Sequence, residues 1–292
     1  MVLNGRKFFK IFLVLIIAAV IIRIGLIRFN RMQFGDGVAL IYIDGVIGES
    51  SGASLVKTGG SYLDQLHAAA EDARIKAVIL RINSPGGSAA ASQELYRAVL
   101  DLRQQGKPVV ASLGDTAASG GYYTAAAADY IYANGSTITG SIGVIMQSAN
   151  LAELYEMLGI DVEVVKSGEF KDMGSASRPL SGAERELLTE LIMDAWDQFV
   201  EDVSTARNLP RDQVEQVADG RIMTGRQALE AGLVDELGTL KDAEQKALEL
   251  AGITGTYYIQ TYYEKPGLLG RLLSIIDGII PKAGTNLRYQ WI

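Results

Sequence analysis

Ala117-Ala118-Ser119-Gly120-Gly121-Tyr122-Tyr123 joins an apolar run, residues 108–113, to an alanine-rich run, residues 124–128. The apolar run predicts a short buried strand, and the small residues after Ser119 predict the start of a helix. A serine at such a corner lies at a helix N-terminus, where unpaired N–H groups and the helix dipole favour a developing negative charge. The alternative is an ordinary N-cap serine on a buried alanine-rich helix.

Strand-like and helix-like stretches alternate on both sides of this corner, which predicts an α/β fold with a mostly parallel sheet. Strands are expected at 38–43, 76–82, 109–113, 130–132, 142–146, 162–165 and 257–262. Helices are expected at 61–73, 87–103 and 119–128, and a capping box of Ser181 and Glu184 introduces another whose apolar stripe runs through 187–200.

Composition excludes several classes of function. The 292 residues carry a net charge of −7, which argues against nucleic acid as the main partner. There is no cysteine, so thiol catalysis and disulfides are excluded. The single histidine, His67, lies among polar residues of the predicted helix 61–73 and is interpreted as a surface or structural residue.

The N-terminus has the pattern of a membrane anchor. Residues 11–22 form an unbroken apolar run within a stretch of about twenty hydrophobic residues, enough to span a bilayer. A cleavable signal peptide is the alternative, but no small-residue cleavage site follows the run. We therefore expect a stub and transmembrane helix over 1–29, a linker over 30–36 and a folded body over 37–265. Basic residues flank both ends of the anchor, so charge leaves its orientation open.

The C-terminal tail, residues 266–292, is predicted to be amphipathic. Its leucines and isoleucines recur at helical spacing between 268 and 280. Such a stripe is expected to be buried against its own domain, a neighbouring subunit or a membrane surface. Because its polar face carries one basic residue, Arg271, against Asp277, subunit contact is favoured over an anionic membrane.

Two further stretches supply groups that a nucleophilic serine needs. Asn83-Ser84-Pro85-Gly86-Gly87 follows a predicted strand, and its glycines expose N–H groups at a helix start. These suit an oxyanion hole, with one donor from Gly86 or Gly87 and one from Gly120. A tight turn is the alternative. A phosphate loop is disfavoured because no lysine follows the glycines at the required spacing.

The second stretch contains two lysines, Lys166 and Lys171, within residues 166–175. A lysine can take a proton from serine only when it is neutral, and burial among apolar groups favours that form. Ser141, in the turn 139–143, adds a hydroxyl that could orient the amine. Solvated loop lysines and a turn serine are the alternatives.

Taken in order, these motifs resemble the signal peptide peptidase A (protease IV) family in its short, single-repeat form. The resemblance rests on the stretches 83–87, 118–122, 139–144, 166–172, and 219–225 with 231–238. It implies a ClpP/crotonase-like fold, assembled into a membrane-anchored homo-oligomeric ring whose catalytic domains lie outside the cytoplasm. It also implies that the substrates are signal peptides left in the membrane after cleavage.

The resemblance also assigns roles to residues. It makes Ser119 the nucleophile and Lys171, rather than Lys166, the general base. Ser141 then positions Lys171, and Gly86 and Gly120 donate to the oxyanion. No metal or cofactor is required. The alternatives are a catalytically silent scaffold of the same fold, an acyl-CoA enzyme of the crotonase type, or another membrane-bound Ser–Lys protease.

Overall fold

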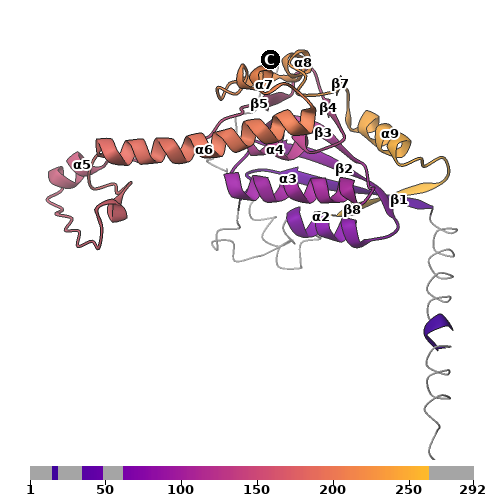
Figure 1. Cartoon of the computed structure of the whole chain (residues 1–292), viewed down its shortest axis with the longest axis horizontal. Coiled ribbons are helices and arrows are strands. Elements are labelled where there is room, and N and C mark those ends of the chain that lie inside the picture. Colours follow the sequence, from indigo (N-terminus) through magenta and orange to yellow (C-terminus); the bar gives the residue numbers. More distant parts are fainter. Residues whose placement is uncertain (1–14, 19–34, 49–61, 263–292) are drawn as a thin grey trace, which may run out of the picture.

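The computed structural model describes residues 15–18, 35–48 and 62–262 (Figure 1). Most of the predicted anchor over 1–29, and the predicted tail over 266–292, therefore lie outside the described residues. Within the described ranges no helix is both long enough and apolar enough to cross a membrane.

Within the described residues, one eight-stranded sheet forms the centre of the fold, in the order β6-β5-β3-β2-β1-β8, with β4 beside β3 and β7 beside β4. All pairings are parallel except β5 with β6. This mixed α/β architecture fits the ClpP/crotonase-like fold expected from the sequence. The strands are β1 (Asp36–Asp44), β2 (Ile75–Ser84), β3 (Val109–Ala118), β4 (Tyr130–Ala133), β5 (Ile138–Gly140), β6 (Ile222–Thr224), β7 (Glu236–Leu237) and β8 (Tyr257–Tyr262).

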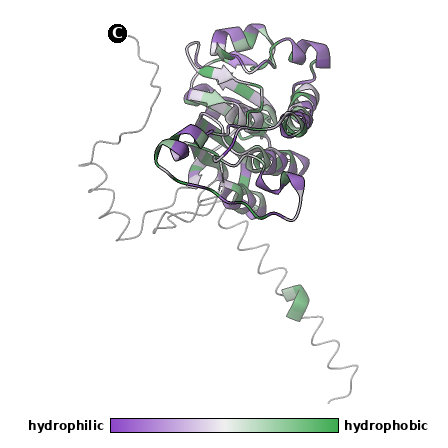
Figure 2. Cartoon of the chain, turned by 90° about the vertical axis from the view of Figure 1, so that its left-hand side faces the viewer, coloured by the Kyte–Doolittle hydropathy of each residue, from purple (hydrophilic) through white to green (hydrophobic). Residues whose placement is uncertain are grey.

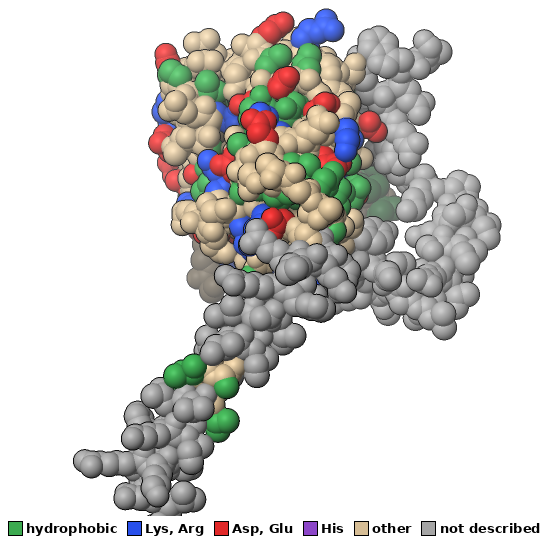
Figure 3. Space-filling model, turned by 90° about the vertical axis from the view of Figure 1, so that its right-hand side faces the viewer, with side chains coloured by type: hydrophobic (Ala, Val, Ile, Leu, Met, Phe, Trp, Pro, Cys, Tyr) green, Lys and Arg blue, Asp and Glu red, His purple; other side chains and the backbone are tan. Residues whose placement is uncertain are grey.

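Helices cover both faces of the sheet, as a parallel sheet requires. Alternate β1 residues divide between the faces: Ile41 packs in the core with α2, α3 and α4, whereas Leu40 packs in the core with α9. Figure 3 shows the side of the molecule on which α9 lies, where acidic and basic side chains are interspersed over the surface. The helices are α2 (Tyr62–Glu71), α3 (Ala89–Gln104), α4 (Gly120–Ala126), α5 (Ala152–Met157), α6 (Gly182–Arg207), α7 (Arg211–Glu215), α8 (Gly225–Glu230), α9 (Leu240–Leu250) and the 3₁₀ turn η1 (Glu169–Asp172).

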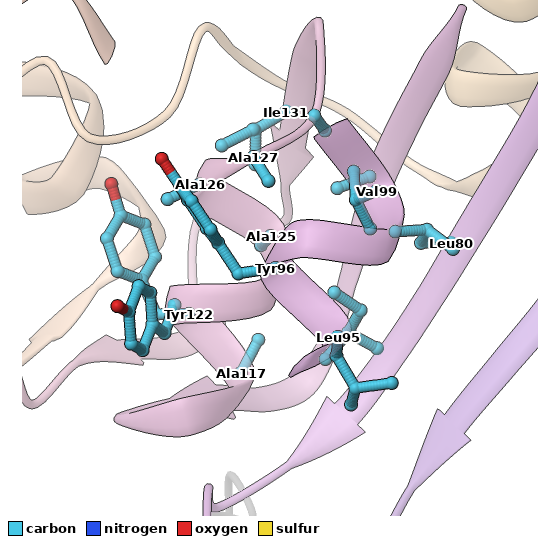
Figure 4. Packing of buried hydrophobic residues seen from close by; sticks show 14 of the residues in the cluster. Leu80, Leu95, Tyr96, Val99, Ala117, Tyr122, Ala125, Ala126, Ala127 and Ile131 are labelled. Carbon is cyan, nitrogen blue, oxygen red and sulfur yellow. The ribbon is translucent and has the colours of Figure 1, made fainter. Parts of the chain in front are cut away.

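Helix α4 is buried along its whole length, and this explains its small residues. It contacts α3, α6, β2 and β3, and Figure 4 shows Ala125, Ala126 and Ala127 in the same cluster as Val99 of α3. A Cβ atom on Gly120 would lie 2.1 Å from Ser92 Oγ, so no larger residue fits there. The ring of Tyr123 stacks on Phe199 of α6 with centroids 4.3 Å apart. The start of α4 is thus fixed against both α3 and α6.

Helix α6 leaves the body of the molecule. Its C-terminal half is anchored in the core through Phe199, Val200 and Val203. At 26 residues it is about 39 Å long, and its N-terminal half extends away from the sheet (Figure 1). Residues 144–181, which we call the arm, lead from the body to the projecting end of α6 and contain α5 and η1. Figure 2 views the molecule from the side on which the arm lies.

Two predicted strands, 142–146 and 162–165, are wrong. Both segments lack regular structure, and the second lies in the arm. Both segments contain the β-branched residues that are common in strands. Such residues favour a strand only where a neighbouring strand pairs with them and other residues cover one face. Neither segment pairs with a strand among the described residues, and Val165 is 93% exposed and Ile145 81% exposed.

Candidate active site

Ser119 occupies the corner between β3 and α4 that the sequence predicted. It stands at the N-cap position of α4, yet its side chain makes no capping hydrogen bond. Its backbone has φ 52° and ψ −123°, a conformation that is strained for a residue other than glycine. The ordinary N-cap interpretation therefore does not hold, because the hydroxyl does not perform that role.

The sheet brings the other predicted residues to the same edge. Ser84 at the end of β2 pairs with Ala117 of β3, which brings the glycine pair after β2 close to Ser119. On the other side Ala118 pairs with Gly140 of β5, which brings Ser141 to the corner. The carboxyl ends of parallel strands form the usual site of chemistry in α/β folds.

Backbone hydrogen bonds hold both serines in place. The N–H of Ser119 donates to the carbonyl oxygen of Gly140 at 2.8 Å. The N–H of Ser141 donates to the carbonyl oxygen of Arg221, also at 2.8 Å. Ser141 likewise has a positive φ of 54°. The two strained serines are thus fixed by neighbouring chain segments rather than by their own side chains.

Gly86 and Gly87 differ in what their N–H groups do. The N–H of Gly86 donates to the buried Ser84 Oγ at 3.1 Å. Gly87 pairs with Ile47 in an isolated parallel β-bridge. The N–H of Ile47 donates to the carbonyl oxygen of Gly86, and the N–H of Ser88 donates to the carbonyl oxygen of Ile47. In such a bridge the residue between the two bonded ones, here Gly87, directs its own N–H away from Ile47. Gly87 also lines the cavity at Ser119. These bonds favour Gly87, the other glycine that the sequence allowed, as the partner of Gly120.

A cavity of about 500 Å³ opens at Ser119 and Ser141. One wall comes from α6, where Trp196 is held by a 2.7 Å hydrogen bond from its indole Nε1 to the carbonyl oxygen of Ala218. The lining residues are Pro85, Gly87, Ser119, Ser141, Gly143, Val144, Ile145, Ile192, Met193, Trp196, Ala218, Asp219 and Gly220. The sequence did not indicate this wall, because Ile192 and Trp196 look like two more members of a core stripe.

Asp219 is the single titratable side chain among these lining residues. Its carboxylate pairs with Arg221 at 2.6 Å, and the hydrogen bonds from Arg221 lower the pKa of Asp219 to about 2. A carboxylate of such low pKa is a weak base. His67, the only histidine, is exposed on α2 and does not line the cavity. Among the described residues that line the cavity, one chain therefore offers Ser119 no competent base.

Lys171 is not brought to this cavity. It lies in η1 on the arm, where it is exposed, and the next residue, Asp172, is bonded through Arg178 to Glu184 in the first turn of α6. Trp196, which lines the cavity, lies fourteen residues along α6 from Gly182, or about 21 Å, so this turn stays away from the cavity of its own body. Of the predicted site residues, Ser119, Ser141, Gly86 and Gly120 come together, and Lys171 does not.

Comparisons with known proteins identify the family to which the chain belongs. The model of peptidase family S49 matches residues 101–254. The chain is 45% identical to a candidate protease of Synechocystis sp. over 74% of this chain and 78% of that protein. It is 38% identical to a candidate signal peptide peptidase SppA of Enterococcus faecium, over 70% of this chain and 61% of that protein. Protease 4 of Haemophilus influenzae is 37% identical over 76% of this chain but 36% of its own length. The chain therefore belongs to peptidase family S49, as its resemblance to signal peptide peptidase A indicated.

Proposed function

We propose that this peptidase is a serine endopeptidase in which Ser119 is the nucleophile and Lys171 of a second copy of the chain is the general base. The observation that carries the proposal is Ser119 itself, strained and without a capping bond at the mouth of a cavity. Strain of this kind persists where function requires it. The relatives named as signal peptide peptidase and protease 4 support the same chemistry.

We invoke a second copy because Lys171 lies on the arm, and the described residues that line the cavity of its own chain include no competent base. The arm also has the surface of an interface, since its large apolar residues are exposed rather than packed. They are Ile145, Met146, Leu151, Leu154, Met157, Leu158, Ile160, Val162, Val164, Val165 and Phe170. A head-to-tail contact, in which each arm covers the next body, would close into the predicted ring.

In the proposed reaction, neutral Lys171 takes the proton of the Ser119 hydroxyl as the oxygen attacks a peptide carbonyl. The carbonyl oxygen becomes an oxyanion that accepts hydrogen bonds from the N–H groups of Gly87 and Gly120. The protonated lysine then donates its proton to the departing amine. Water, deprotonated by the same lysine, releases the acyl group from Ser119. Ser141, which lines the cavity beside Ser119, is the hydroxyl that orients the amine.

The lining of the cavity favours apolar peptides as substrates. Ile192, Met193 and Trp196 present carbon surface beside Ser119, and Val144 and Ile145 add to it. Apolar side chains gain free energy by leaving water for such a surface. Cleaved signal peptides are apolar, and a membrane anchor over 1–29, with the catalytic domain outside the cytoplasm, would hold the enzyme beside them.

A fluorophosphonate probe tests the nucleophile directly. We expect it to label the wild-type protein on Ser119, because an activated serine displaces fluoride from phosphorus. Tryptic mass spectrometry locates the adduct, and the Ser119→Ala variant should remain unlabelled. An unlabelled wild-type protein would favour the catalytically silent scaffold instead.

A lysine base also predicts the pH dependence. Activity should rise from neutral to alkaline pH, because the base acts only after losing its proton. The His67→Gln variant should give the same profile when kcat is measured on a fluorogenic peptide. Loss of turnover on removing this imidazole would exclude the Ser–Lys mechanism.

A further inference from the structure

The two lysines of the arm have different surroundings. Lys166 Nζ donates to Asp172 Oδ1 at 2.7 Å and to the carbonyl oxygen of Glu169 at 2.9 Å. Lys171 Nζ has neither a hydrogen bond nor an ion pair within the described part of the chain. The turn that carries Lys171 is therefore closed by the head group of Lys166, and the amine of Lys171 remains available.

Asp172, the residue after Lys171, connects this turn to α6. It accepts two hydrogen bonds from the guanidinium of Arg178, from Nε at 3.0 Å and from Nη2 at 2.8 Å. The other side of the same guanidinium donates to Glu184, with Nη1 at 2.8 Å from Oε2. The hydrogen bonds from Arg178, followed by those from Lys166, lower the pKa of Asp172. The carboxylate is therefore charged at neutral pH.

Glu184 makes the connection rigid. Its side chain is only 2% exposed, and it accepts the N–H of Ser181 at 2.8 Å in the capping box that starts α6. Hydrogen bonds from Arg178 and from the backbone of Ser181 lower the pKa of Glu184 to about 2. A continuous series of charge-assisted bonds therefore runs from the lysine turn into the first turn of a helix anchored in the core.

Two hydrogen bonds to backbone carbonyls hold the chain just after this turn from the other side of the arm. The N–H of Leu151 donates to the carbonyl oxygen of Ala176 at 2.7 Å, and Ser148 Oγ donates to that of Gly174 at 3.1 Å. The arm is thus a closed unit in which the amine of Lys171, unlike that of Lys166, makes no bond within the described part of the chain. A freely moving loop lysine would rarely reach the 2.6–3.2 Å that proton transfer requires.

We propose that Asp172 and Arg178 are positioning residues that fix the lysine turn to α6, so that Lys171 is presented to Ser119 of another copy in reactive geometry. This inference rests on the proposed function. Misplacing a reacting group by about 1 Å costs about 100-fold in rate, so the network acts through the placement of Lys171. Neither residue touches the substrate.

The test compares kcat and KM of Asp172→Asn, Arg178→Met and Arg178→Lys on a fluorogenic peptide with an apolar residue before the leaving group. We expect Asp172→Asn and Arg178→Met to lower kcat by about 10- to 100-fold with little change in KM. Arg178→Lys keeps the positive charge but loses the planar guanidinium that bonds Asp172 and Glu184 together. Its kcat should therefore lie between that of Arg178→Met and that of the wild type. The double variant should lose no more than either single variant, because both act on one turn.

Asp72→Asn is the matched control. Asp72 also accepts two bonds from one guanidinium, at 3.0 and 2.7 Å from Arg74, but it lies between α2 and β2, outside the cavity lining. Its kcat should equal that of the wild type. Light scattering and thermal unfolding on every variant measure assembly and folding.

Wild-type kcat in Asp172→Asn would overturn the proposal. So would a loss of kcat that only follows a loss of oligomer mass or of folded protein, because that result indicates a purely structural network. The Lys171→Ala variant distinguishes failure of the proposed general base from failure of the positioning role. If it remains active, the proposed base has failed. If it is inactive while Asp172→Asn is fully active, the positioning role alone has failed.

Discussion

Replacing either Ser119 or Lys171 by alanine is expected to lower kcat for peptide hydrolysis by at least about 1,000-fold, because nucleophile and base act as one unit. The proteins should remain folded, since Ser119 makes no capping bond and Lys171 is exposed. Lys166→Ala should keep most of the activity. Lys166 makes one bond to Asp172, and Arg178 still makes the other two. Steady-state kinetics on a fluorogenic peptide measure all three variants.

The result for Lys166 decides which lysine is the base. Circular dichroism and oligomer mass first establish that each variant is intact. Full activity of Lys171→Ala, or inactivation by Lys166→Ala alone, would contradict the assignment. A residual rate far above that of the uncatalysed reaction is compatible with it, because the oxyanion donors and the cavity remain in place.

Mixing two inactive variants should restore activity. If Lys171 reaches Ser119 of another copy, oligomers assembled from equal amounts of Ser119→Ala and Lys171→Ala contain some sites with both groups intact. Each site draws its serine and its lysine from different copies. Random assembly therefore makes about half times half, or about a quarter, of the sites active. Co-expression with two affinity tags, followed by kinetics on the doubly purified oligomer, measures this fraction.

The control pairs Ser119→Ala with the double variant Ser119→Ala/Lys171→Ala, which has no intact serine at all. It should show no recovery at any ratio. Recovery in the first mixture alone supports a base supplied by another copy. If the first mixture is as inactive as its components while wild-type oligomers form normally, serine and lysine must come from the same chain.

Local signals in the sequence were sufficient for much of the fold and for the serine corner. Small residues around Ser119, a strand before them and a capping box at Ser181 each determine short-range structure, and the structure contains all three. The face of α6 that lines the cavity could not be predicted in this way. Residues such as Trp196 have the spacing of core positions, and a pattern does not reveal what covers them.

Three other features depend on geometry that local sequence patterns do not reveal. Whether Gly86 or Gly87 offers a free N–H depends on the direction of each peptide plane, and this follows from the bridge to Ile47. The segment 162–165 has strand-forming residues but no strand partner in the described part of the chain, so local preference gave the wrong structure there. Lys171 lies far from Ser119 because α6 extends from the body, and the length of a helix says nothing about the direction in which it points.

The separation of the lysine turn from the serine cavity of its own chain has a consequence for when the enzyme becomes active after synthesis. A newly made single copy would have a nucleophile without a base, so it would be latent in the way that a zymogen is latent. No propeptide would need to be removed, because contact with another copy would supply the missing group. Activity would then depend on the local concentration of copies. A cell could set proteolysis by how many copies it places in one patch rather than by cleaving each of them.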